Sequence, residues 1–269
     1  MGPPSAKISN TAKGFKAFRN YMVFFDNPSQ FCYRVLAGCG SIRIGTKSKM
    51  NIVFDLDGTL TDPYDGITNC ILHALEELGK APPPPVSLKW CIGPPLMESF
   101  ARLLETDDDE RVQAAVAIYR KRFGSVGLFE NEVYDGITAI LHHLRKEGHT
   151  LFVATSKPRV YADRIVDRFG LGPYFKRVYG SELDGTRSDK TRLLAYLLKK
   201  ESIRGSEAVM VGDRRHDMIG ARANGMDGVG VLWGYGSREE LVASGARHCV
   251  GIPQELSTTL NGKPRQAKR

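Results

Sequence analysis

Two acidic residues separated by a single position, Asp55 and Asp57, follow a short apolar segment at residues 52–54. Gly58 and Thr59 complete the run Asp-Leu-Asp-Gly-Thr. Carboxylates in this arrangement serve as a nucleophile, as a general acid–base or as oxygen ligands of a metal ion. A polar turn at the end of a strand is the structural alternative, and this motif alone does not exclude it.

Three further groups of polar residues occupy equivalent positions. Thr155 and Ser156 come after a second apolar segment, Lys190 stands where a helix is expected to begin, and Asp213 and Asp217 follow another apolar segment. Because open α/β folds bind ligands at the carboxyl edge of a parallel sheet, one sheet would bring all these side chains into one crevice. Independent turn residues have no reason to converge in this way, so the set favours a catalytic site.

The residue types predict phosphoryl transfer. A phosphomonoester is a dianion near neutral pH and repels a carboxylate nucleophile, so the site must supply positive charge before Asp55 attacks. We expect Mg²⁺ as the cofactor, held by Asp55, the backbone carbonyl of Asp57 and Asp213, since Mg²⁺ prefers oxygen ligands. Lys190 would add a fixed cation. The Thr155 hydroxyl and nearby N–H groups would donate hydrogen bonds to the phosphoryl oxygens.

The two remaining acids have distinct expected roles. Asp57 would protonate the leaving oxygen and afterwards deprotonate the attacking water, which requires a carboxyl group with a modestly raised pKa. Asp217 would support the metal ion or Lys190 from behind the direct ligands. Residues 214–216 either contact substrate or form an exposed helix start, and for His216 the second interpretation is favoured.

Short apolar strands alternate with amphipathic helices from Met50 onward. Strand-like segments lie at residues 52–54, 151–154, 178–179, 208–211 and 229–232. Apolar residues between them recur with a helical period in stretches that end at Gly79 and Gly148. This alternation predicts an α/β fold with a Rossmann-like core, in which helices cover both faces of a parallel sheet.

A long insertion with a helical pattern separates the first two strands. It spans roughly 100 residues, far more than the usual connection between parallel strands. The pattern therefore predicts a second, α-helical domain that caps the first. We expect the core domain at residues 50–64 and 136–258 and the cap domain at residues 65–135.

Two features of the expected cap have structural explanations. The proline-rich segment 81–86 is incompatible with a helix interior and predicts an extended joint. Thr106 is expected to cap a helix whose first turn carries the acids of 107–110, because acids there complement the helix dipole. We therefore do not expect these acids to bind a metal.

The net charge of +8 is concentrated in an N-terminal segment. Residues 1–49 carry eight basic side chains against one acid and are expected to be an extension outside the core. A targeting peptide, an electrostatic arm for phosphate-rich partners and translation from a start codon assigned too early all stay open. The last is favoured, because Met50 directly precedes the first strand. Residues 259–269 form a basic tail of no assigned role.

The remaining composition argues against several classes of protein. Beyond the N-terminal extension the charges nearly balance, so no nucleic-acid partner is expected. No apolar run approaches the roughly 18 residues of a membrane-spanning helix, so no membrane association is expected. The five cysteines include no C-x-x-C pair, which favours the cytoplasm over an oxidising compartment. We expect a small phosphorylated substrate and a monomer or homodimer.

The motifs resemble those of a known family. In order and spacing, the four polar groups resemble motifs I to IV of the haloacid dehalogenase superfamily, and the helical insertion resembles its C1-type cap. Over residues 50–257, longer strings are similar to the branch described as 5′-nucleotidase-like, close to the phosphoglycolate phosphatases: FDLDGTLTDPYDGIT, CIGPPLMESF, GLFENEVYDGI, VATSKP, YGSELDGTR, VGDRRHDMIGARANG and GVLWGYGSREEL. Residues 1–49 have no counterpart in this resemblance.

The resemblance implies a phosphatase that forms an aspartyl-phosphate on Asp55, and it leaves the substrate open. A 5′-nucleotidase acting on nucleoside monophosphates is favoured, with phosphoglycolate phosphatase and protein-tyrosine phosphatase as alternatives. The loop at residues 91–95 resembles the substrate-specificity loop of the family, with Gly93 and Pro94 as candidate substrate contacts. A plain turn between helices is an equal alternative for this loop.

Two other functions stay open. A phosphosugar mutase would return the phosphoryl group to its substrate, whereas a phosphatase releases inorganic phosphate. A non-catalytic binding protein would use the fold as a scaffold and the basic extension as a docking arm. Such a scaffold has no need of the paired carboxylates Asp55 and Asp57 beside a metal site.

Overall fold

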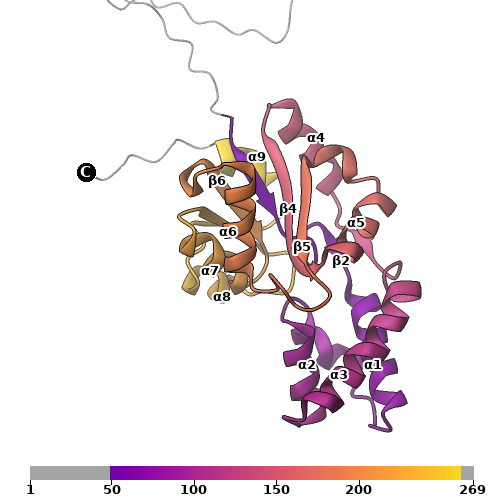
Figure 1. Ribbon diagram of the computed structural model, residues 1–269. Helices are drawn as coiled ribbons and strands as arrows, with labels where there is room; N and C mark the ends of the chain where they lie inside the picture. Colours follow the sequence, from indigo (N-terminus) through magenta and orange to yellow (C-terminus); the bar gives the residue numbers. More distant parts are fainter. Residues whose placement is uncertain (1–48, 262–269) are drawn as a thin grey trace, which may run out of the picture. The chain divides into compact units, whose positions relative to one another are not determined.

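The computed structural model describes residues 49–261, and these contain a six-stranded parallel sheet (Figure 1). The strand order is β5-β4-β1-β6-β7-β8. The strands are β1 (Asn51–Phe54), β4 (Thr150–Pro158), β5 (Arg177–Ser181), β6 (Ala208–Gly212), β7 (Asp227–Val231) and β8 (His248–Val250). The predicted α/β class and its parallel sheet are confirmed. The short edge strand β8 was not predicted, because three residues show no recognisable period.

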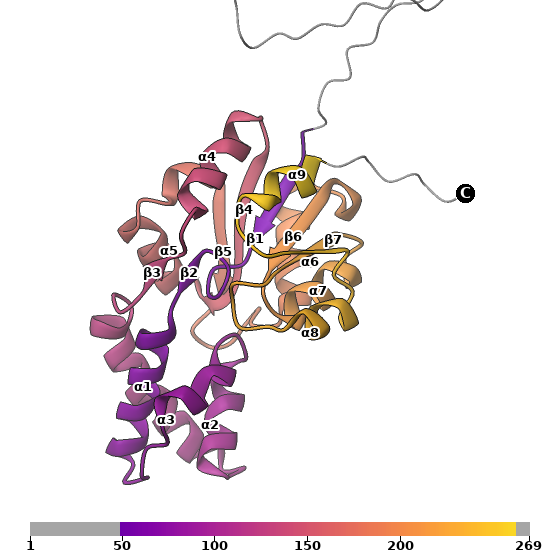
Figure 2. The ribbon, with the colours of Figure 1, turned by 180° about the vertical axis from the view of Figure 1, so that it is seen from behind.

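Helices cover both faces of this sheet (Figures 1 and 2). Consecutive residues of β1 belong to different buried clusters: Ile52 and Phe54 to one, Val53 to the other. Such a strand is apolar without alternation because both of its faces are buried. The first cluster includes side chains of α4 (Ile137–Lys146), α5 (Arg159–Arg168) and α9 (Glu255–Asn261), and the second those of α6 (Lys190–Glu201) and α7 (Arg215–Ala223). The short helix α8 (Arg238–Ala243) follows β7.

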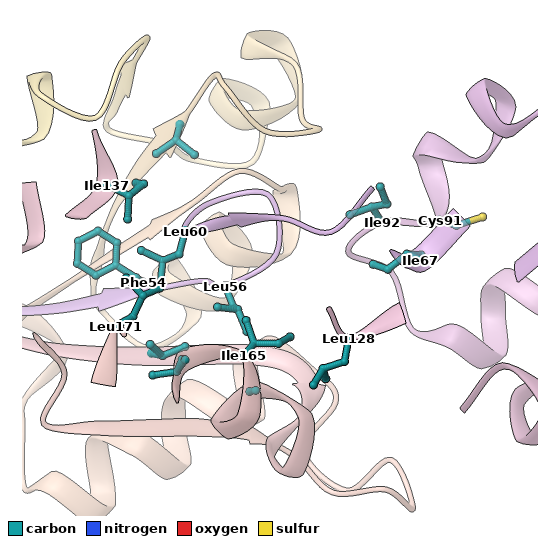
Figure 3. Packing of buried hydrophobic residues seen from close by; sticks show 14 of the residues in the cluster. Phe54, Leu56, Leu60, Ile67, Cys91, Ile92, Leu128, Ile137, Ile165 and Leu171 are labelled. Carbon is teal, nitrogen blue, oxygen red and sulfur yellow. The ribbon is translucent and has the colours of Figure 1, made fainter. Parts of the chain in front are cut away.

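The insertion between β1 and β4 forms a helical cap. It contains α1 (Tyr64–Glu77), a 3-10 helix (Pro85–Cys91), α2 (Leu96–Leu104), α3 (Asp109–Arg122) and a short π-helix (Phe123–Gly127). One hydrophobic cluster runs from Phe54 and Ile137 at the sheet to Ile67 and Ile92 in the cap (Figure 3). The proline-rich joint is non-helical over residues 81–84, and Pro85 then begins the 3-10 helix. The exact domain boundaries stay predictions.

Two very short strands bring the ends of the insertion together. Strand β2 (Thr61–Asp62) pairs antiparallel with β3 (Glu132–Val133). The sequence did not predict this ribbon, because strands of two residues leave no periodic pattern.

The predicted N-cap of the third cap helix was wrong. Asp108, not Thr106, caps α3: its carboxylate accepts hydrogen bonds from the N–H groups of Glu110 and Arg111. The Thr106 hydroxyl instead accepts from the N–H of Asp108 and shapes the turn before the helix. Aspartate is as good an N-cap as threonine, so the choice depends on where the preceding turn ends. Asp109 and Glu110 lie in the first turn of α3 as expected, whereas Asp108 is the N-cap and Asp107 precedes the helix.

The predictions for the N-terminal extension and for most of the basic tail concern residues outside the described range. These are residues 1–48, with Cys32 and Cys39, and residues 262–269 of the basic tail. Residues 259–261 belong to α9. Within residues 49–261, none of the helices combines the length and the apolar character that crossing a membrane requires.

Two glycines allow the first and last cap segments to touch. A Cβ atom at Gly66 would lie 2.1 Å from the carbonyl oxygen of Gly127 and 2.6 Å from that of Glu130. The N–H of Gly66 donates to this Glu130 carbonyl at 2.9 Å. Only glycine permits so close an approach of two backbones.

We expect Gly66→Ala to lower the free energy of unfolding by about 2–3 kcal/mol, because the new methyl group meets backbone oxygens that cannot move independently. Urea unfolding followed by circular dichroism measures this. The control is Gly79→Asn, at a position with φ +70° where none of the described atoms would lie within 4 Å of a Cβ and where asparagine tolerates the left-handed backbone. Equal urea midpoints for Gly66→Ala and the unsubstituted protein would contradict the packing described here.

An ion pair stabilises the same contact between the first and last segments of the cap. The Arg122 guanidinium donates to both carboxylate oxygens of Glu130, at 2.8 and 3.0 Å, and Asn69 donates to the same carboxylate at 3.3 Å. The hydrogen bonds from Arg122 lower the pKa of Glu130, although partial burial opposes the shift.

The lowered pKa predicts a pH-dependent effect of Glu130→Gln. The ionised carboxylate stabilises the fold at pH values above its unfolded-state pKa of about 4.3, and this contribution is lost as the pH falls through the lower folded-state value. We expect the substitution to cost about 1 kcal/mol at pH 7 and close to nothing below about pH 3. Urea unfolding at both pH values tests this, with the exposed Glu132→Gln as control. A cost that does not change with pH would contradict the assignment.

Candidate active site

The predicted site residues converge at the carboxyl edge of the sheet. Asp55 directly follows β1, and Asp213 directly follows the neighbouring strand β6. The N–H of Asp55 donates to the Val211 carbonyl at 2.9 Å, which fixes the two turns relative to each other. Thr155 lies in β4, on the other side of β1, and Lys190 begins α6. Parallel strands end at one edge, which explains why residues so distant in sequence meet here.

Lys190 holds two of the carboxylates. Its ammonium group lies 2.9 Å from Asp55 Oδ1 and 2.8 Å from Asp217 Oδ1, and it donates to the Ala154 carbonyl at 2.9 Å. Burial alone would lower the pKa of Lys190, but the carboxylates of Asp217 and Asp55 outweigh it, so the pKa is raised and the amine stays charged. Burial raises the pKa of Asp217 against the opposing effect of Lys190.

Asp213 has no lysine partner among the described residues. Its Oδ2 accepts the N–H of Tyr235 at 2.8 Å, and its Oδ1 lies 3.4 Å from the Thr59 hydroxyl. The side chain is fully buried, and this burial, together with the nearby Asp217 and Asp55, raises its pKa well above the usual range. A carboxylate held in this way is ready to bind a cation.

The cluster fits a divalent metal ion such as Mg²⁺. One oxygen each from Asp55, Asp213 and Asp217 lie within 4.8 Å of one another. With Asp57, the cluster has four carboxyl groups, and among the described residues two ammonium groups, those of Lys157 and Lys190, pair with them, so a bound cation would balance the remaining charge. Hard oxygen donors with excess negative charge are what Mg²⁺ prefers. The grouping adds Asp217, which pairs with Lys190, to the expected ligands.

Asp57 has a partner that the sequence did not reveal. The ammonium group of Lys157 donates to Asp57 Oδ1 at 2.7 Å and lies 4.7 Å from the centre of the Phe123 ring. Burial raises the pKa of Asp57, although Lys157 opposes the shift. In the sequence, Lys157 stands two positions after Thr155 in a short polar segment. Nothing in that segment distinguishes it from an ordinary surface lysine.

Thr155 and Ser156 both line the space above the carboxylates. The Thr155 hydroxyl accepts the N–H of Lys157 at 3.2 Å, and the Ser156 carbonyl accepts the Ser181 hydroxyl at 2.8 Å. Thr155 is almost completely buried, so its hydroxyl is held by the strand and not by solvent.

A cleft of about 170 Å³ lies between the carboxylates and the cap. Its polar floor includes Asp55 and Asp57, and cap residues form much of its wall. The predicted residues Gly93 and Pro94 line it, with further apolar or aromatic side chains from Leu96, Met97, Tyr119, Phe123 and Tyr161. Cys91 also lines it, but burial raises the pKa of this thiol to about 12, so it is not a nucleophile near neutral pH.

A glycine-rich loop packs against the turn that carries Asp213. Gly58 has φ +80°, and a Cβ there would lie 2.3 Å from Asp213 Oδ2. A Cβ at Gly234 would lie 2.2 Å from the Gly58 carbonyl oxygen, and the Trp233 indole donates to the Thr59 carbonyl at 3.0 Å. The role of this loop in the structure is close backbone packing around Asp213.

The three residues between Asp213 and Asp217 have different environments. The Arg214 side chain contacts the cap, Arg215 is exposed and His216 is half-buried. Burial lowers the pKa of His216, and among the residues that the structure describes it is not part of the cleft wall.

The family follows from this fold and from comparison with known proteins. Residues 52–231 match the family model described as haloacid dehalogenase-like hydrolase. The chain is 48% identical over 198 residues to the 5′-nucleotidase of Pseudomonas aeruginosa, which covers 74% of this chain and 89% of that protein. It is 38% identical over 190 residues to the tyrosine-protein kinase PtkA of Mycobacterium tuberculosis, covering 71% of this chain and 64% of that protein.

Solved structures agree with these relatives. A predicted phosphatase from Clostridium acetobutylicum superimposes with a TM-score of 0.76 at 40% identity, covering 79% of this chain and 99% of that one. The chain belongs to the haloacid dehalogenase-like hydrolases, and it is a phosphatase of that family that acts on phosphomonoesters. The resemblance stated from the motifs is confirmed.

The raised pKa of Asp213 predicts how the metal-free protein responds to Asp213→Asn. Burial and the neighbouring Asp217 and Asp55 make this carboxyl group costly in the metal-free fold at neutral pH, so the neutral isostere should stabilise the protein in a chelator by about 1 kcal/mol, or roughly 2–4 °C in Tm. Excess Mg²⁺ should raise the Tm of the unsubstituted protein and leave that of Asp213→Asn unchanged. Differential scanning calorimetry measures both effects.

Asp163→Asn serves as the control, since it removes a carboxylate on α5 that pairs with Arg159. This control should respond to Mg²⁺ like the unsubstituted protein. An equal rise in Tm with Mg²⁺ for Asp213→Asn would show that the ion binds elsewhere.

Proposed function

We propose that the protein hydrolyses small phosphomonoesters in a Mg²⁺-dependent reaction through an aspartyl-phosphate on Asp55. The observation that carries this proposal is the state of the Asp55 carboxylate. Its Oδ1 accepts the N–H of Leu56 at 2.7 Å and lies 2.9 Å from the Lys190 ammonium group. Within residues 49–261, Oδ2 makes no hydrogen bond and keeps its lone pairs for attack on phosphorus.

The proposed reaction has two steps. Asp55 attacks phosphorus, the bond to the leaving oxygen breaks, and Asp57 gives that oxygen a proton. Asp57 then takes a proton from water, whose oxygen attacks the phosphorus of the aspartyl-phosphate, and inorganic phosphate leaves with Asp55 regenerated. A bound Mg²⁺ would neutralise charge on the phosphoryl oxygens.

Contacts of Asp57 support its role as the acid and base. Burial raises its pKa, which favours a protonated carboxyl at the start of the reaction. The hydrogen bond from Lys157 engages Oδ1, and the ring of Phe123 beside that lysine restricts its position. Oδ2 is then the oxygen that exchanges the proton with the leaving group and with water.

We propose nucleoside monophosphates as substrates. The relative named 5′-nucleotidase supports this, because it is 48% identical and matched over 89% of its length. The aromatic side chains of Tyr119, Phe123 and Tyr161 in the cleft wall also suit a planar base. The cleft of about 170 Å³ is smaller than the ~300–1,000 Å³ of typical ligand sites, so a nucleotide requires the cap to open.

Phosphoglycolate is the second candidate, favoured by the small cleft and by one side chain. Arg120 lines the cleft from α3, and in the part of the chain that the structure describes it forms no ion pair. A guanidinium group there suits the carboxylate of phosphoglycolate. Relatives named phosphoglycolate phosphatase are 25% to 27% identical.

We also propose a cytoplasmic location. Cys70, Cys91 and Cys249 are free thiols in the described residues, which agrees with a reducing compartment.

Phosphate release tests the proposed function. With Mg²⁺ we expect turnover of AMP and UMP with the highest kcat/KM, compared with phosphoglycolate, a phosphotyrosine peptide and several sugar phosphates. Asp55→Asn should lower kcat at least about 10³-fold on every substrate, because an amide oxygen is a far weaker nucleophile. Chelation should abolish turnover.

The exposed Asp167→Asn on α5 is the matched control and should retain full activity. Unchanged turnover by Asp55→Asn would rule out Asp55 as nucleophile. A highest kcat/KM on phosphoglycolate would replace the nucleotide assignment and leave the mechanism intact.

A further inference from the structure

Arg214 joins the carboxylate cluster to the cap. Its position directly after Asp213 places its backbone in the turn that carries the carboxylate cluster, where its N–H donates to Asp217 Oδ2 at 3.1 Å. Its side chain, however, reaches a different part of the molecule. The terminal Nη1 group donates to the backbone carbonyl of Ile92, in the loop between the 3-10 helix and α2.

A carboxylate fixes the middle of the same side chain. Arg214 Nε donates to Glu240 Oε1 at 3.0 Å, and the N–H of Arg215 donates to this same oxygen at 2.9 Å. The Arg214 side chain is only 13% exposed, so the pair is shielded from solvent screening more than a surface ion pair is. Glu240 lies in the first turn of α8, and it thereby holds the guanidinium in the orientation that reaches Ile92.

The loop at residues 91–95, which Arg214 contacts through Ile92, forms part of the cleft wall. Gly93 has φ +103°, and a Cβ there would lie 3.2 Å from Arg214 Cγ and 3.3 Å from Nη1. Arg214 thus packs directly against the backbone of the loop. On its other side the loop presents Gly93 and Pro94 to the cleft, whose described lining does not include Arg214.

We propose that Arg214, held by Glu240, is a positioning residue that fixes the loop at residues 91–95 over the cleft and thereby sets which leaving groups the enzyme accepts. The inference deepens the proposed phosphatase function and rests on it. Arg214 contacts neither the substrate space nor the carboxylate oxygens with its side chain, so its effect is on the leaving-group side of the reaction. Substitution of Arg214 should therefore alter the position of the loop at residues 91–95 and leave the phosphoryl-transfer step itself unchanged.

The chain provides a matched control in the next residue. Arg214→Met removes the guanidinium and keeps the length of the aliphatic stem, and Arg215→Met makes the same change at an exposed side chain. With AMP, we expect Arg214→Met to raise KM and lower kcat/KM at least about 10-fold, while Arg215→Met stays within about 2-fold of the unsubstituted enzyme.

A second substrate separates loop positioning from damage to the carboxylate cluster. Acetyl phosphate has a small leaving group that does not need the loop, so Arg214→Met should turn it over within about 3-fold of the unsubstituted rate. Glu240→Gln should also raise the KM for AMP and lower kcat/KM, by a smaller factor than Arg214→Met. It replaces Arg214→Met in the test if that variant does not fold. Equal losses on both substrates, or identical kinetics for the two arginine variants, would overturn the proposal.

Hydrogen exchange makes the test independent of catalysis. Backbone amides of the 91–97 segment should exchange faster in Arg214→Met than in Arg215→Met, because only the first loses the contact with the Ile92 carbonyl. If the unsubstituted protein releases no phosphate from any substrate, the proposed function fails while this comparison still decides on the loop. Equal protection in the two variants would overturn the proposal even in an active enzyme.

Discussion

A buried ammonium group shared between two carboxylates is the interaction on which the active-site edge depends. Lys190 is 4% exposed and lies within ion-pair distance of both Asp55 and Asp217. A buried lysine is costly unless it is paired, and buried carboxylates are costly unless a cation compensates them. The strand ends, the start of α6 and the start of α7 are therefore mutually dependent, since each supplies a charge that the others need.

The same electrostatic balance explains the backbone around Asp213. Among the described residues this carboxylate accepts only neutral donors, so the cluster keeps excess negative charge. The loop that contains Gly234 packs its backbone against this turn, and Tyr235 extends the contact to Asp62 on β2, the strand that leads into the cap. These contacts connect the turn that carries Asp213 to the segment that enters the cap.

Much of the fold and of the site could be predicted from the sequence, for identifiable reasons. The strands are apolar and alternate with helices. Asp55 and Asp213 directly follow strands, Lys190 begins a helix and Thr155 lies in the last part of β4, so the rule for parallel sheets brings them together. Their catalytic roles stay predictions. Lys157 and Arg214 could not be assigned, because their function depends on partners about 100 residues away or more, Asp57 and Ile92. Spacing carries no information about such contacts.

Other details could not be predicted because neighbouring residues offer equivalent local signals. Both Thr106 and Asp108 are good helix caps, and only the three-dimensional turn shows that Asp108 is used. The β2 and β3 ribbon is too short for a period to appear. The substrate could not be predicted for a different reason. The cleft combines aromatic walls with an arginine from the cap, and these features suit different leaving groups.

The most direct test of the account is to trap the covalent intermediate during turnover. The enzyme is mixed with Mg²⁺ and excess nucleoside monophosphate, quenched in acid within milliseconds, reduced with borohydride and digested for mass spectrometry. Reduction of an aspartyl-phosphate converts that residue to homoserine, and the account predicts this product at position 55 alone. Homoserine at position 57 or 213, or phosphate release with no homoserine at any position, would contradict Asp55 as the nucleophile.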